Sequence, residues 1–170
     1  IASKNHTPAA NTNSIACTAD MQKSIAGKIL RFHVLANSDS EEDQKLKLEV
    51  KDRLVDYMKD ILDGAEDVKE TKKRITENRE TICLVAEQEI QKQGYTYPVS
   101  VNLEKCYFPM KTYGDCTFPA GTYEALRVCI GKAKGRNWWC VLYPGLCFAD
   151  SVNVIVPDEK KQELKNILTE

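Results

Sequence analysis

The clearest alternation of apolar and polar residues lies in the stretch KILRFHVLANSDSEEDQ. Every second position there is apolar, as in a β-strand with one buried face: Leu30, Phe32, Val34 and Ala36. Arg31 and His33 would then point to the polar face. The next residues favour turns and helix N-caps because their short side chains accept hydrogen bonds: Asn37, Ser38, Asp39 and Ser40. We expect a half-buried strand followed by a helix, with Ser38 and Glu41 at capping-box spacing.

From residue 41 the apolar spacing changes to three and four, which is typical of amphipathic helices. The first predicted helix runs to about Leu62 and ends at Gly64. Its apolar stripe has five members: Leu46, Val50, Leu54, Met58 and Ile61. A second helix is expected from about Val68 to Gln93, with Gly94 at its end. The short connection between them predicts a hairpin of two helices packed on one face of a sheet.

After the second helix the period of two returns and predicts several strands. These are residues 99–103, residues 126–130, the stretch NWWCVLY at 137–143, and a short strand at 152–156. Pro157 is placed to open a last helix. We therefore expect an α+β fold: a mostly antiparallel sheet, the two-helix hairpin on one face, and a short C-terminal helix.

The domain organisation follows from length and composition. Residues 1–27 mix Asn, Thr, Ser, Ala and Pro without an apolar period, which predicts a flexible tail or linker. Residues 28–170 are expected to form a single globular domain. With 42% hydrophobic and 29% charged residues, the chain can bury a core beneath a well-solvated surface.

The charge balance argues against nucleic acid as a partner. Lys and Arg number 24 and Asp and Glu number 25, so the net charge is -1, whereas phosphate binding depends on clustered cations. No apolar run approaches the roughly 18 residues that a membrane span needs.

The sequence offers no set of residues typical of catalysis. His33 is the only histidine in the expected domain, and a solvated or hydrogen-bonded ring accounts for it without a catalytic role. The acidic cluster from Asp39 to Asp43 fits the start of a helix, where carboxylates complement the dipole. The stretch GKAKGR lacks the spacing of a phosphate-binding loop and fits a hairpin turn. We expect no enzyme activity, no cofactor, no metal and no small-molecule substrate.

Seven cysteines are many for 170 residues, and none form a Cys-x-x-Cys pair. An oxidising compartment with disulfides is favoured over a cytosolic protein with buried thiols. Cys140 and Cys147 are separated by six residues across Pro144-Gly145, so a closed loop is sterically easy. Cys106 and Cys116 bracket another turn-rich segment and could close in the same way.

Adjacent tryptophans on one strand point to opposite faces of its sheet. One of Trp138 and Trp139 can therefore fill the core. The other is either a partner-binding anchor or covered by the C-terminal helix, and the sequence leaves both open.

Two long motifs carry a family resemblance. RFHVLANSDSEEDQKLKLEVKDRLVDYM and, later, FPAGTYEALRVCIGKAKGRNWWCVLYPGLCF resemble the stage II sporulation protein R family of endospore-forming bacteria over about residues 28–150. Cys17, Cys83 and Cys129 depart from the family pattern. The chain also lacks the hydrophobic export segment that the family implies, and we expect that segment to precede it.

The resemblance implies a signalling protein made in the forespore and exported into the space between the two membranes around it. There it would activate a membrane-embedded aspartic protease, which processes the sigma-E precursor in the mother cell. Two family-like stretches are the least explained by core packing. They supply the candidate partner-binding residues: Asn37, Ser38, Asp39, Trp138, Trp139, Leu142, Tyr143, Pro144 and Phe148.

Two alternatives stay open at this point. One is a thiol-dependent enzyme that uses Cys140 or Cys147 and would need a low-pKa, accessible thiolate. The other is an inhibitor of the same protease.

Overall fold

A computed structural model of the protein describes residues 22–113 and 116–148. Residues 22–26 are helical. Ten further elements follow in order: β1 (Leu30–Leu35), α2 (Glu41–Ile61), α3 (Val68–Glu77), α4 (Arg79–Lys92), β2 (Val99–Phe108), β3 (Lys111–Tyr113), β4 (Cys116–Phe118), β5 (Gly121–Ile130), β6 (Asn137–Tyr143) and the 3-10 helix η1 (Leu146–Phe148).

The main sheet has four strands in the order β2-β5-β1-β6. Its two outer pairs, β2 with β5 and β1 with β6, are antiparallel, whereas β1 and β5 are parallel. Strands β3 and β4 form a separate antiparallel ribbon. The prediction of an α+β fold with a mostly antiparallel sheet is confirmed.

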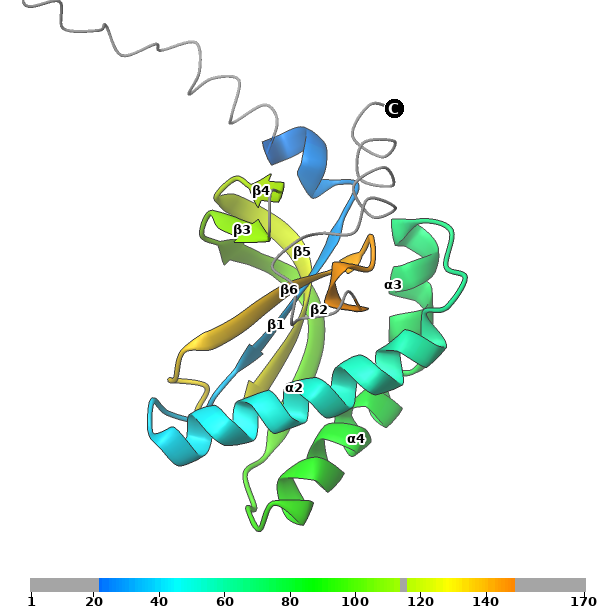
Figure 1. The fold of residues 1–170 in the computed structure, drawn as a ribbon. Coiled ribbons are helices and arrows are strands. Elements are labelled where there is room, and N and C mark those ends of the chain that lie inside the picture. The colour runs from blue at the N-terminus through cyan, green and yellow to red at the C-terminus, as the bar shows by residue number, and fades with distance from the viewer. Residues whose placement is uncertain (1–21, 114–115, 149–170) are drawn as a thin grey trace, which may run out of the picture.

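Helices α2, α3 and α4 cover one face of the main sheet, and the β3–β4 ribbon lies on the other side (Figure 1). The first predicted helix is present as α2, and its apolar stripe packs on β1, β5 and β6. Its N-cap is Ser40, whose hydroxyl accepts from the Asp43 amide at 3.2 Å, so the expectation that Ser38 caps the helix was wrong.

The predicted second helix is in fact two helices, α3 and α4, which meet at Asn78. The side-chain amide of Asn78 donates to the Arg74 carbonyl at 2.8 Å, and its oxygen accepts from the Tyr57 hydroxyl at 3.2 Å. The backbone of Asn78 departs from helical geometry (φ -106°, ψ 8°), and this interrupts the helix. Three helices therefore stand where a two-helix hairpin was expected.

Strand β1 is buried on both faces, which corrects the prediction of a half-buried strand. It is a central strand, with β5 on one side and β6 on the other. Leu30, Phe32 and Val34 join the core under the helices. Arg31 and His33 face a second, smaller cluster that is formed by eight buried residues: Ile25, Ile29, Phe108, Phe118, Tyr123, Ala125, Val141 and Leu146.

The residues just before β1 contribute to the second cluster. Ile25, in the segment assigned to a flexible tail, is buried in the second cluster. The strand predicted at 152–156 and the helix predicted after Pro157 lie outside the described residues. No helix in the described part of the chain is long and apolar enough to cross a membrane.

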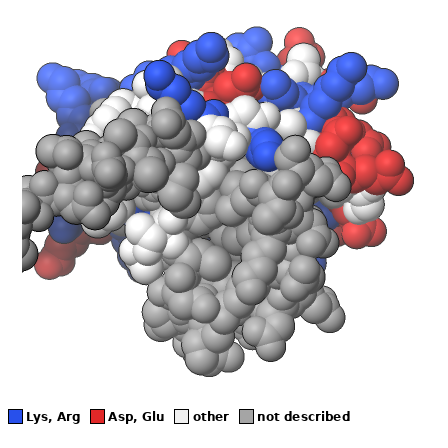
Figure 2. Space-filling view, turned by 90° about the horizontal axis from the view of Figure 1, so that it is seen from above, with Lys and Arg blue, Asp and Glu red and all other residues white. Residues whose placement is uncertain are grey.

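Figure 2 shows cationic and anionic side chains side by side along the described rim of one end of the molecule.

Candidate functional site

The turn between β1 and α2 binds another turn of the same protein. The Asn37 side chain donates to the Asp43 carboxylate at 2.9 Å and accepts from the Lys132 amide at 2.9 Å. The Asp39 carboxylate accepts from the Arg136 amide at 2.7 Å. These bonds join the β1–α2 turn to the β5–β6 turn. Asn37 and Asp39, which were predicted to bind a partner, therefore have a structural role within the protein itself.

Two glycines permit this close approach. At Gly135 a Cβ atom would lie 2.2 Å from the Ser38 backbone oxygen. At Gly131, whose φ is +57°, it would lie 2.3 Å from the side-chain oxygen of Asn37. The basic stretch GKAKGR is thus shaped to receive Asn37 and Ser38, a pairing that no local sequence signal revealed.

The carboxylate of Asp43 is the polar centre of this junction. Ser38 donates to it at 2.5 Å, in addition to the bond from Asn37. Burial raises the pKa of Asp43, but the hydrogen bonds from Ser38 and Asn37 lower it by more in total. The pKa of Asp43 is therefore below its ordinary value. The carboxylate is therefore held ionised at neutral pH.

The loop after β6 packs inward. Leu142 and Pro144 are buried, and the Tyr143 hydroxyl donates to the Glu66 carbonyl at 2.9 Å. Phe148 and Tyr143 line a cavity of about 230 Å³ at the end of α2. These predicted binding residues are brought together, but their side chains contact the protein's own core more than they project from it.

Cys140 in β6 and Cys147 in η1 carry free thiols, and the disulfide between them stays a prediction. The Cys147 thiol donates to the Val141 carbonyl at 3.0 Å. Burial is the main cause that raises the pKa of Cys147 well above its ordinary value, and a hydrogen bond with Cys140 raises it further. A thiol-dependent enzyme would need the opposite shift. Cys106 is also free, with a pKa raised by burial, and the side chain of Cys116 lies outside the described residues.

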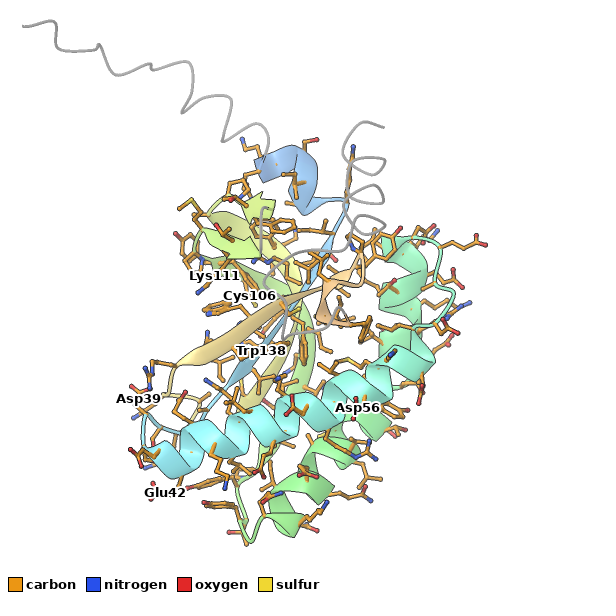
Figure 3. The ribbon with its side chains drawn as sticks, in the orientation of Figure 1. Asp39, Glu42, Asp56, Cys106, Lys111 and Trp138 are labelled. Atoms are coloured by element: carbon orange, nitrogen blue, oxygen red, sulfur yellow. The ribbon has the colours of Figure 1, made fainter. Side chains whose placement is uncertain are left out.

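The adjacent tryptophans point to opposite faces of the sheet, and each is half-buried. Trp138 lies between β6 and α2 (Figure 3), with its ring 5.4 Å from that of Phe32 and the Lys51 ammonium 5.1 Å above it. Trp139 lies on the face opposite α2, 4.8 Å from the Phe108 ring. Neither ring is a fully exposed anchor.

On that second face, the guanidinium of Arg31 is completely buried among aromatic rings. It lies 4.2 Å from the centre of Phe108, 4.7 Å from Tyr123 and 5.4 Å from Phe118. Cation–π attraction is strongest where the cation is desolvated, so these rings stabilise a charge that would otherwise be costly to bury. The sequence pattern had placed Arg31 toward solvent.

His33 is the next residue of β1 on the same face. Its ring stacks at 5.3 Å on Trp139 and lies 4.9 Å from Phe108, and only 4% of the residue is exposed. Burial, with the positive charges of Arg127 and Arg31, lowers its pKa to about 4. The imidazole is therefore neutral at neutral pH, in place of the solvated or hydrogen-bonded ring that was expected.

A cavity of about 310 Å³ opens beside His33 and Trp139. Its polar wall contains Arg127, whose guanidinium donates to the Glu104 carboxylate at 3.2 Å. Figure 3 places Cys106, another lining residue, on the side of the sheet away from α2. Among the described residues no group of three or more His, Cys, Asp or Glu side chains is arranged to hold a metal ion. We take this cavity as the candidate site.

Comparison with known proteins gives one consistent result. Residues 26–153 match the family described as stage II sporulation protein R. The chain is 36% identical over 151 residues to the stage II sporulation protein R of Bacillus subtilis (strain 168). That alignment covers 86% of the chain and 66% of the relative, so the chain spans just under two thirds of the relative's length. No solved structure matches the chain significantly. The resemblance carried by the two long motifs is confirmed.

Proposed function

The chain belongs to the stage II sporulation protein R family, and from this premise we propose that it is an exported signal that activates a membrane-embedded aspartic protease. The protease would then process the sigma-E precursor in the mother cell. The observation that carries the proposal is the family match over residues 26–153. The site of action would be the space between the forespore and mother-cell membranes.

The described residues support a binding role over a chemical one. His33 is buried and neutral, and the thiols of Cys106 and Cys147 have raised pKa values. A binding protein can activate an enzyme by having higher affinity for its competent state, for example a dimer, than for its inactive state. The contact surface that we propose is the face of the sheet opposite α2, next to Trp139.

The proposal is tested by reconstituting the protease and the sigma-E precursor in vesicles, with the protein added to the extracytoplasmic side. Precursor cleavage should depend on the added protein. Trp139→Ala should reduce that cleavage strongly, and Trp139→Phe, which keeps a ring against His33, should retain more of it. Leu84→Ala is the matched control, because Leu84 is an exposed apolar residue (51%) on α4.

Three outcomes count against the proposal in different ways. Cleavage that ignores the wild-type protein would refute activation. Cleavage that stops when the protein is added would identify an inhibitor. Full activity of a folded Trp139→Ala variant, checked by circular dichroism, would move the contact away from this face.

Export itself has a chemical test. In an oxidising compartment Cys140 and Cys147 should be found as a disulfide, since their thiols already interact in the structure. Mass mapping of the protein recovered from sporulating cells would detect the linked peptides. Two alkylated thiols at these positions would argue against an oxidising compartment.

A further inference from the structure

The strongest unexplained feature of the molecule is the buried imidazole of His33. Neither of its ring nitrogens has a hydrogen-bond partner among the residues that the structure describes. Buried polar groups are nearly always paired, and an unpaired one calls for a specific explanation, such as a role in binding. His33 also lines the cavity on the face opposite α2, so a group that enters there can be the missing partner once the side chains that cover the two buried ring nitrogens shift.

The charges around this cavity favour an anion. Arg127 lines it, and Glu104 is the one carboxylate among its described lining residues; Lys105 also borders it, but its side chain alternates to the other face of β2. The ammonium group of Lys111 lies 5.4 Å from the centre of the Trp139 ring, which forms another wall. An incoming anion would therefore meet more positive than negative charge.

Arg127 and His33 are suited to a carboxylate in particular. A guanidinium can bind a carboxylate through two parallel N–H···O bonds, and a neutral imidazole can donate one more. Arg127 makes a single bond to Glu104 at 3.2 Å, and both side chains are about 40% exposed (39% and 42%). Glu104 can thus be displaced, because an ion pair this exposed has little net stability.

The size and the rim of the cavity indicate where the carboxylate comes from. A volume of about 310 Å³ is at the lower end for ligand pockets, which suits one side chain. Half-buried Trp139 forms an aromatic wall at the polar end, and Tyr107, which is 66% exposed, lies at the rim. Aromatic residues that surround a polar contact are typical of protein interfaces.

We propose that the cavity formed by His33, Arg127 and Trp139 binds the side-chain carboxylate of an Asp or Glu residue on a partner protein. The carboxylate takes the place of Glu104 on Arg127 and hydrogen-bonds to His33. Given the proposed function, on which this choice of partner rests, the acidic residue belongs to the extracytoplasmic part of the protease.

The site can be tested without the protease by NMR titration. The probes are N-acetyl-glutamate α-amide and its uncharged match, N-acetyl-glutamine α-amide. The glutamate probe should shift the His33 ring protons and the Trp139 indole proton saturably at millimolar concentration, and the glutamine probe should not. With two histidines in the chain, the His33 signals are readily assigned.

Variants locate the binding in this cavity. Arg127→Gln should weaken glutamate binding about tenfold or more, since it removes a charge-assisted bond. Glu104→Gln should tighten it about threefold, because the competing carboxylate is gone. The matched controls are Lys72→Gln and Glu124→Gln, which break a comparable ion pair elsewhere on the surface and should change nothing. No shift with glutamate, equal shifts with both probes, or unchanged binding by Arg127→Gln would overturn the proposal.

The reconstituted protease separates this inference from the proposed function. Arg127→Gln should lose activation while Lys72→Gln retains it. If the wild-type protein fails to activate, the proposed function falls, and the titration still decides whether the cavity binds carboxylates. If wild type and Arg127→Gln activate equally, the inference falls alone. Equal binding of acetate or phosphate with full activity of Arg127→Gln would indicate a free anion and would also overturn it.

Discussion

The two faces of the sheet have different chemistry. The buried core under α2 and α4 is mostly aliphatic, with residues such as Val34, Leu54 and Leu126 packed between the helices and the sheet. The other face buries a guanidinium and an imidazole among aromatic rings and has a cavity at its edge. One face therefore holds most of the apolar core, and the other carries the polar groups that we propose to bind a partner.

The first way to test this division is to damage the aliphatic face. Leu54→Ala should lower the free energy of unfolding by about 2–5 kcal/mol, because Leu54 is fully buried and its removal leaves a cavity. Urea denaturation measures the change. Leu48→Ala is the control on the same helix, since Leu48 is 44% exposed, and should change stability by roughly 0.5 kcal/mol or less. Similar losses for both would deny that the helices cover the core.

The second prediction concerns pH and the other face. His33 has a pKa of about 4 in the native state and 6.5 as its ordinary value, so between these values the unfolded chain binds more protons. The free energy of unfolding should therefore fall by up to about 3 kcal/mol as the pH drops from 6.5 to 4. Denaturation curves of wild type and His33→Phe isolate this contribution as their difference. A difference that does not vary with pH would contradict the burial of a neutral imidazole.

The third prediction compares cations on the two faces. Arg31→Met should lower the free energy of unfolding by about 2 kcal/mol or more, because it removes the contacts of a desolvated guanidinium with three aromatic rings. Lys51→Met should lower the free energy of unfolding by about 0.5–1 kcal/mol, since the ring contact of Lys51 is with the half-buried Trp138. Thermal and urea unfolding of both variants provide the measurement. Equal losses of stability would mean that the aromatic cluster adds no special stability to the face opposite α2.

The smallest effect is expected at the cavity. Arg127→Gln should change the free energy of unfolding by about 1 kcal/mol or less, because its pair with Glu104 is exposed to solvent. Binding effects of this variant can therefore be separated from folding effects. A loss as large as that of Leu54→Ala would show that Arg127 is structural, and the division between the faces would then be less sharp.

Local periodicity predicted much of the architecture. The apolar stripe of the first helix marked its buried side, and its expected end near Leu62 is one residue from the observed end at Ile61. Strands 126–130 and 137–143 were found within β5 and as β6. The break at Asn78, whose side chain accepts a hydrogen bond from Tyr57 on another helix, was missed.

The candidate site was predicted less well. Trp139 was assigned to the partner surface and lines the cavity, whereas Arg127 was not singled out. His33 was given an ordinary role, and its unpaired nitrogens had no signal in the sequence. The one usable sign was the alternation of polar Arg31 and His33 with apolar residues in a strand that proved central.

By itself the sequence determined the order of helices and strands, the faces of α2 and the family, because each depends on residues close together in the chain or on long motifs. Only the tertiary structure decided that both faces of β1 are buried and that His33, Arg127 and Trp139 meet at one cavity. The physical reason is that the neighbours of β1 in the sheet come from β5 and β6, which lie far along the chain. What a strand's polar face contacts depends on those distant partners, and no local pattern records them.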